Sequence, residues 1–99
     1  AILEKVERSP GNVKMTLTID PQWMKYILHK GFVGINGCSL TVGDVSSDSF
    51  ALHLIPETLQ ITNLGNYEEG DQLNIEVDQQ TYTTVQTVER YLKTQRRFN

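Results

Sequence analysis

Apolar and polar residues alternate near the start of the chain, which predicts a β-hairpin. In residues 13–19 every second residue is apolar and the residues between are Lys or Thr. A period of two is typical of a strand with one buried face. Residues 2–8 form a second strand-like run, and Ser9-Pro10-Gly11-Asn12 between the runs has the composition of a tight turn.

A short helix is predicted to follow. Asp20-Pro21 suits a helix start, with Asp as the N-cap and Pro in the first turn. The next apolar residues have helical spacing, and Gly31 is suited to end the helix. The apolar stripe consists of Trp23, Met24, Ile27 and Leu28. We expect this helix to cover one end of a sheet.

The rest of the chain alternates short strands with turns and ends in a longer helix. Strands are expected at residues 32–35, 39–45, 50–54 and 72–77, a helical turn at 56–60 and a helix at 83–95. Six short strands separated by turn residues favour a mostly β fold, a six-stranded antiparallel Greek-key barrel with short capping helices and a C-terminal helix. The expected division is a barrel over residues 1–80 and a C-terminal helix over 81–99 that is a candidate oligomerisation element.

Composition narrows the classes of protein. The chain has 99 residues, a net charge of −3 and a single cysteine, Cys38. One cysteine excludes an internal disulfide and fits the cytoplasm. No basic patch indicates nucleic acid, and no apolar run is long enough to span a membrane. The first residues, Ala1-Ile2-Leu3, lack Met. We therefore expect a piece of a longer protein or a processed one.

Candidate ligand-binding groups gather after the Asn36-Gly37 pair, a strong signal for a tight turn between strands. Ser39 and Thr41 follow it within an otherwise apolar strand. Alternation places both hydroxyls on one face, where they can act together on a ligand. The alternative is that they face solvent or bond to the backbone.

Four segments resemble the C-terminal barrel of riboflavin synthase over about residues 24–92. They read KGFVGINGCSLTVG (30–43), HLIPETL (53–59), NLG (63–65) and GDQLNIEVD (70–78). Each segment alone is a weak signal, whereas four in the family's order are specific. The resemblance implies dismutation of two molecules of 6,7-dimethyl-8-ribityllumazine, with transfer of a four-carbon unit to form riboflavin and without a metal or redox cofactor.

The resemblance also implies which residues form the site. The implied ligand-binding residues are Lys30, Gly34, Ser39, Thr41, Ile55, Glu57 and Thr58. The implied catalytic residues are Asp78, Ser39 and Thr41. Structural alternatives stay open: a core residue for Ile55, a turn residue for Thr58, solvated charges for Lys30 and Glu57, and an N-cap for Asp78. Cys38 is expected to be buried and inert, and both histidines to be structural rather than metal ligands.

The resemblance implies a partner and leaves two functions open. The N-terminal barrel of the family is absent, so a neighbouring subunit of a homotrimer is expected to complete the site. On this reading the chain alone is inactive or weakly active. The alternative is a lumazine- or flavin-binding protein of the luminescence type, which binds without turnover. The retained SLTVG and IPETL segments and Asp78 favour the enzyme.

Overall fold

The structure is a computed structural model that describes the backbone of residues 1–98 and the side chains of residues 1–95. Residue 99, the last of the expected helical segment, lies outside the described residues. The elements in chain order are β1 (Ile2–Ser9), β2 (Asn12–Thr18), the 3-10 helix η1 (Pro21–Tyr26), β3 (Phe32–Ile35), β4 (Cys38–Val45), β5 (Ser49–Leu54), α1 (Pro56–Ile61), the 3-10 helix η2 (Leu64–Asn66), β6 (Ile75–Val77) and α2 (Gln79–Phe98).

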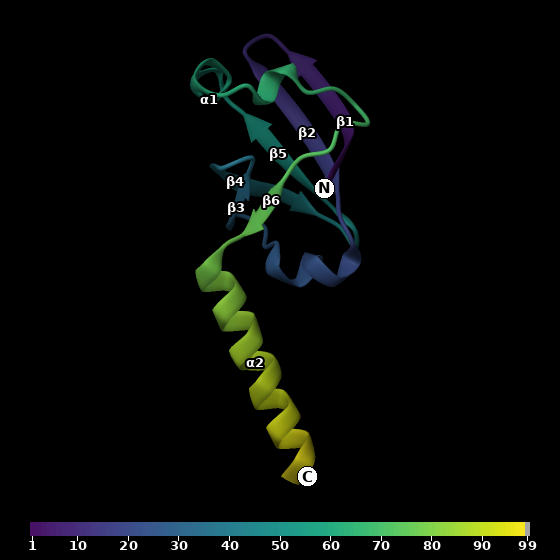
Figure 1. Cartoon of the computed structure of the whole chain (residues 1–99), viewed down its shortest axis with the longest axis vertical. Coiled ribbons are helices and arrows are strands. Elements are labelled where there is room, and N and C mark those ends of the chain that lie inside the picture. The colour runs from purple at the N-terminus through teal and green to yellow at the C-terminus, as the bar shows by residue number, and fades with distance from the viewer. Residues whose placement is uncertain (99) are drawn as a thin grey trace.

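All six strands pair antiparallel in the order β1-β2-β5-β4-β3-β6, as Figure 1 shows. Consecutive hairpins join β3, β4 and β5, and β2 returns beside β5, which is Greek-key connectivity. The segment before β6 also reaches β1. Leu3 donates its N–H to Asp71 O at 2.8 Å, Leu73 donates to Ala1 O at 2.9 Å, and Ile2 bridges Gln72. These bonds close the sheet, so the predicted barrel with a C-terminal helix is confirmed.

The barrel encloses a single apolar core. The alternation predicted for the second strand is confirmed, since Val13, Met15 and Leu17 are buried. Every strand except β6 contributes a fully buried side chain, and β6 packs half-buried residues against the core. The buried cluster comprises Leu3, Val13, Met15, Leu17, Ile27, Val33, Ile35, Val42, Phe50, Leu52, Leu54, Leu64 and Leu73.

The first helix is shorter than predicted. The Asp20 carboxylate caps it by accepting from Gln22 N at 3.1 Å, as expected. The helix is of the 3-10 type and ends at Tyr26 rather than near Gly31. Ile27 then turns into an extended conformation and buries its side chain in the core, and this ends the helix early.

The last strand is also shorter than the expected 72–77. Gln72 pairs with β1, whereas Ile75–Val77 pair with β3. The segment therefore passes from one edge of the sheet to the other as it closes the barrel, and regular pairing starts only at Ile75.

α2 leaves the barrel and extends well beyond it, giving the molecule principal extents of 56 × 22 × 19 Å (Figure 1). Its first turns rest on η1. The rings of Tyr26 and Tyr82 lie 4.9 Å apart, Gln86 donates to the Tyr26 hydroxyl, and Lys25 pairs with Glu89 at 2.9 Å. The helix is longer than the predicted 83–95. Across residues 1–98, no helix is long and apolar enough to cross a membrane.

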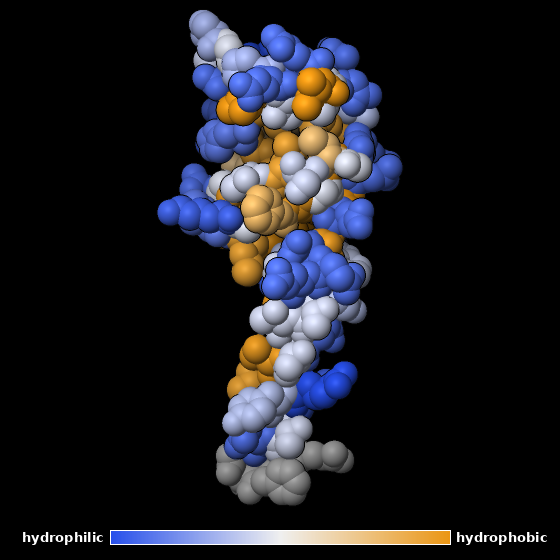
Figure 2. Space-filling model, turned by 90° about the vertical axis from the view of Figure 1, so that its left-hand side faces the viewer, coloured by the Kyte–Doolittle hydropathy of each residue, from blue (hydrophilic) through white to orange (hydrophobic). Residues whose placement is uncertain are grey.

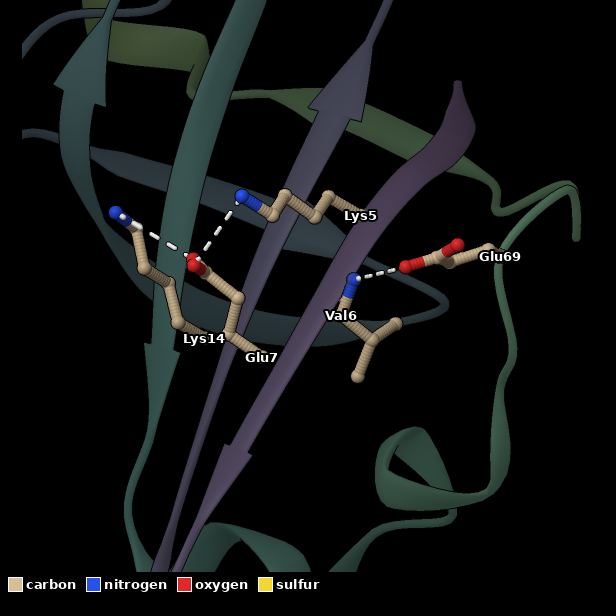
Figure 3. A network of polar contacts seen from close by, with 5 residues as sticks. All are labelled: Lys5, Val6, Glu7, Lys14 and Glu69. Carbon is tan, nitrogen blue, oxygen red and sulfur yellow. Dashed lines mark hydrogen bonds and ion pairs between the residues drawn. The ribbon is translucent and has the colours of Figure 1, made fainter.

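Polar contacts organise the outer surface of β1 (Figure 3). Glu7 pairs with Lys5 at 3.3 Å and with Lys14 of β2 at 3.8 Å. The Glu69 carboxylate accepts from Val6 N at 3.2 Å. The exposed ion pairs stabilise only weakly, whereas the bond from Val6 to Glu69 holds the loop before β6 against β1.

Candidate functional site

Two rows of residues run across the outer face of β6, β3 and β4. In the first row, Gly34 of β3 pairs with Glu76 on one side and Ser39 on the other. In the second row, Phe32 pairs with Thr41, and Asp78 follows the Val77 that pairs with Val33. Alternate residues of a strand share a face, so the two rows stack on one surface.

This surface contains a shallow open pocket of about 220 Å³. Strands β3 and β6 form most of it, the β3–β4 turn closes one side, and the start of α2 closes another. The lining residues are Phe32, Val33, Gly34, Gly37, Ser39, Glu76, Val77, Asp78 and Gln79. The side of the molecule that bears β3, β4 and α1 faces the viewer in Figure 2, where hydrophobic side chains reach the surface within a hydrophilic surround.

Gly34 gives the pocket a floor of bare backbone. A Cβ added there would lie 3.3 Å from Glu76 Cβ and 3.9 Å from Glu76 Oε2. Beside it, the Phe32 side chain is 57% exposed. A flat apolar ring can lie on the backbone against this phenyl group, while the Ser39 hydroxyl and the carboxylates at the edge meet polar substituents.

The Asp78 carboxylate joins the pocket to α2. One oxygen, Oδ2, accepts from Thr81 N at 2.9 Å and from Thr81 Oγ1 at 3.0 Å. This is the N-cap arrangement that the sequence left open as the structural alternative. Asp78 is also half-buried in the pocket wall. The cap fixes the carboxylate in place and leaves Oδ1 for a ligand.

The β3–β4 turn, which precedes Ser39, is tied directly to the residue before β6, the strand that contains Glu76. Asn36 N donates to Asn74 O at 2.9 Å, and Asn74 N donates to Asn36 Oδ1 at 2.8 Å. Asn36 has φ 49° and Gly37 has φ 84°, as the tight turn requires. The two walls of the pocket are therefore held at a fixed separation.

The predicted site residues fall into two groups. The pocket brings together Gly34, Ser39 and Asp78. Thr41 lies on the same face as Ser39, as alternation predicted, in the row of Phe32 and Asp78, but it is not itself a lining residue. Lys30, exposed and with φ 67°, precedes β3 and does not line the pocket.

The other predicted residues lie at α1, at the end of the barrel away from α2 (Figure 1). Ile55 and Glu57 are exposed there, and Thr58 is half-buried and accepts from Thr62 N and Oγ1 through its carbonyl. None of the three is among the pocket's lining residues. Their ligand-binding role, like that of every residue in the set, stays a prediction.

Six lining residues were missed by sequence reasoning: Phe32, Val33, Gly37, Glu76, Val77 and Gln79. Alternation contained the signal for two of them. Phe32 lies two residues before Gly34, and Glu76 two residues before Asp78, so each shares a face with a residue that was predicted.

The structure also places the single cysteine and both histidines. Cys38 is half-buried against the core, less enclosed than expected. The Nδ1 atom of His29 lies 2.8 Å from Gly43 O, so this histidine contacts β4 rather than a helix end. His53 is exposed on β5. Within the described part of the chain, no three His, Cys, Asp or Glu side chains cluster as a metal site needs.

The family model described as "Lumazine binding domain" matches residues 1–78. This chain belongs to the lumazine-binding domain family. The pocket therefore lies on a lumazine-binding domain, and α2 begins where the family match ends.

Curated relatives of this lumazine-binding domain are riboflavin synthases. The one from Escherichia coli (strain K12) is 50% identical over 93 residues, which cover 93% of this chain and 44% of that protein. The one from Chlamydia pneumoniae is 52% identical over 68 residues, which cover 69% and 34%. The chain thus spans less than half the length of the curated relatives it matches.

Solved structures show the same fold. LumP complexed with riboflavin superposes with a TM-score of 0.74 at 23% identity, covering 80% of this chain and 42% of that one. LumP complexed with 6,7-dimethyl-8-(1'-D-ribityl) lumazine gives a TM-score of 0.71 at 24% identity, covering 77% and 42%. At this identity the likeness describes the fold.

Proposed function

We propose that this chain is the C-terminal lumazine-binding barrel of a riboflavin synthase. The observation that carries the proposal is 50% identity to the Escherichia coli riboflavin synthase across 93% of this chain. The proposed reaction converts two molecules of 6,7-dimethyl-8-ribityllumazine into riboflavin and a pyrimidinedione. A four-carbon unit passes between two identical substrates, so no metal or redox cofactor is needed.

The pocket offers the groups that such a substrate needs. In the proposed complex, the heterocycle lies on the Gly34 backbone beside Phe32, and Ser39 and Thr41 donate to its polar edge. Asp78, fixed by Thr81 through one oxygen, uses its free oxygen to orient the ligand or accept a proton. Lys30, Ile55, Glu57 and Thr58 are proposed to contact parts of the ligand beyond the pocket, or the neighbouring subunit.

The site is proposed to be completed by the N-terminal barrel of a neighbouring subunit in a homotrimer. The open, shallow pocket supports this, because its walls cover only one side of a ring. α2 is a candidate assembly element: Val88, Tyr91 and Leu92 are each more than half exposed on a helix that extends beyond the barrel. A Leu92→Glu substitution should then reduce self-association in sedimentation velocity; unchanged sedimentation of a self-associating chain would remove α2 from the interface.

A binding protein without turnover is the second candidate, because LumP shares the fold. The higher identity to riboflavin synthases favours the enzyme. A location in the cytoplasm stays a prediction.

Riboflavin titration tests the binding half of the proposal. We expect saturable quenching of riboflavin fluorescence by the chain, weakened by Ser39→Ala and unchanged by Ser47→Ala in the β4–β5 turn. Absence of quenching at millimolar protein would overturn the proposal. Mixing with a separately prepared N-terminal barrel should then produce riboflavin from the lumazine, whereas binding without any turnover in the mixture would favour the second candidate.

A further inference from the structure

The pocket carries negative charge only. Its charged lining residues are Glu76 and Asp78, and none of the lining residues that the structure describes is Lys, Arg or His. Among the side chains of residues 1–95, the ion pairs are Lys5–Glu7, Lys14–Glu7 and Lys25–Glu89, so Glu76 takes part in none of them.

The backbone pairing of Glu76 places its side chain beside the pocket floor. Glu76 pairs with Gly34, and its Oε2 lies 3.9 Å from the position that a Gly34 Cβ would occupy. The missing side chain at Gly34 lets the carboxylate stand over the pocket floor. A ligand on that floor therefore meets the Glu76 carboxylate at close range.

A carboxylate attracts a neutral polyol chain and repels a chain that ends in a phosphate. The hydroxyl groups of a neutral polyol donate hydrogen bonds to a carboxylate, and such charge-assisted bonds are strong. A phosphate monoester has a charge between −1.5 and −2 at neutral pH, and like charges a few ångströms apart repel. None of the lining residues is a cation of the kind that phosphate sites use. The start of α2 borders the pocket, but the Asp78 carboxylate already caps that first turn by accepting from Thr81 N and places a negative charge there.

We propose that Glu76 is a specificity-determining residue that restricts this pocket to ligands with an unphosphorylated ribityl chain. The inference rests on the proposed function, because it concerns the ligand of the same site. Glu76 accepts hydrogen bonds from the ribityl hydroxyls and, with Asp78, excludes a terminal phosphate.

Riboflavin and flavin mononucleotide are a matched pair of probes, because they share the ring and the ribityl chain and differ only in the phosphate. Titration by flavin fluorescence should give binding of flavin mononucleotide about tenfold or more weaker than that of riboflavin at low ionic strength. The ratio of the two dissociation constants, flavin mononucleotide to riboflavin, should shrink at about 0.5 M salt, where the screening length is a few ångströms.

Glu76→Gln should lower this ratio of dissociation constants at least about threefold, mainly because flavin mononucleotide binds more tightly to the variant. Asp48→Asn removes the same charge from the exposed β4–β5 turn, at the other end of β4 from Ser39, and should leave the ratio unchanged. Far-UV circular dichroism checks that both variants keep the fold.

The outcomes separate this inference from the proposed function. Equal affinity for the two flavins, or a ratio that Glu76→Gln does not alter, overturns the role of Glu76 and leaves the lumazine-binding barrel standing. Failure of both flavins to bind overturns the two proposals together.

Discussion

Asn36 and Tyr67 are joined side chain to side chain: Nδ2 of Asn36 donates to the Tyr67 hydroxyl at 2.8 Å. The other end of the same amide accepts from Asn74 N at 2.8 Å. One side chain thus links the β3–β4 turn to β6 and to the loop after η2. Arg8 holds that loop from β1 by donating to Gly65 O and Tyr67 O. The pocket walls are therefore fixed relative to the barrel by a chain of contacts from β1 to β4.

Two substitutions at Asn36 should lower the free energy of unfolding by different amounts. Asn36→Gly loses the side-chain hydrogen bonds but keeps a residue that tolerates the left-handed φ of 49°. We expect it to lower the free energy of unfolding by about 1 kcal/mol. Asn36→Ala should cost about 1 kcal/mol more, because alanine is strained there. Urea unfolding measures both; equal losses would contradict the backbone argument.

Gly34→Ala should lower the affinity for riboflavin strongly and the thermal stability of the fold only slightly. The added methyl group would lie 3.3 Å from Glu76 Cβ and occupy the pocket floor. We expect at least about a tenfold loss of affinity, since a ring lifted from the backbone loses its contacts. Fluorescence titration and thermal unfolding of the same samples compare the two effects. Unchanged affinity would show that the ligand binds away from Gly34.

The core prediction contrasts two large apolar residues. Phe50 is 1% exposed and Ile61 is 83% exposed. Phe50→Ala should lower the free energy of unfolding by about 3–5 kcal/mol, the usual cost of an aromatic cavity. Ile61→Ala should change it by less than about 0.5 kcal/mol. Denaturant midpoints give both values, and a large effect at Ile61 would indicate that α1 packs against a further copy or segment.

The Lys25–Glu89 pair should make the docking of α2 sensitive to alkaline pH. The hydrogen bond that Lys25 Nζ donates to the Glu89 carboxylate raises the pKa of Lys25 above its ordinary value of 10.5. A raised lysine pKa means that the pair stabilises the fold below that ordinary value and loses its effect as the pH rises through the folded-state pKa. The advantage of the wild type over Glu89→Gln should therefore vanish in strong alkali. A chemical-shift titration of the Lys25 side chain follows the pKa, and equal values in the two proteins would exclude the pair as its cause.

Local patterns predicted most of the barrel. The alternation at Val13, Met15 and Leu17, the turn at Asn36-Gly37 and the cap at Asp20 are each specified by nearby residues, and each is confirmed. The early end of η1 and the late start of β6 were missed. Both depend on tertiary contacts, the burial of Ile27 and the transfer of Gln72 to β1, which no local pattern contains.

The site was predictable only in part for the same reason. Ser39 and Asp78 come from strands that pair through β3, so their approach depends on the sheet order rather than on their spacing in the sequence. Glu76 lies in the same family-like segment as Asp78 but was not predicted as a site residue. Its place in the pocket follows from the register of β6 against Gly34.

The closure of the barrel has a consequence for the order of events during biosynthesis. Leu3 bonds to residues 70 and 71, and Ala1 bonds to Leu73. The outer edge of β1 therefore stays without its partner until almost the whole domain has left the ribosome. Contacts so distant in sequence form slowly, and an unpaired strand edge invites other chains. Chaperone demand should thus be highest before residues 70–73 emerge, and slowing synthesis before residue 70 should lengthen the period of risk.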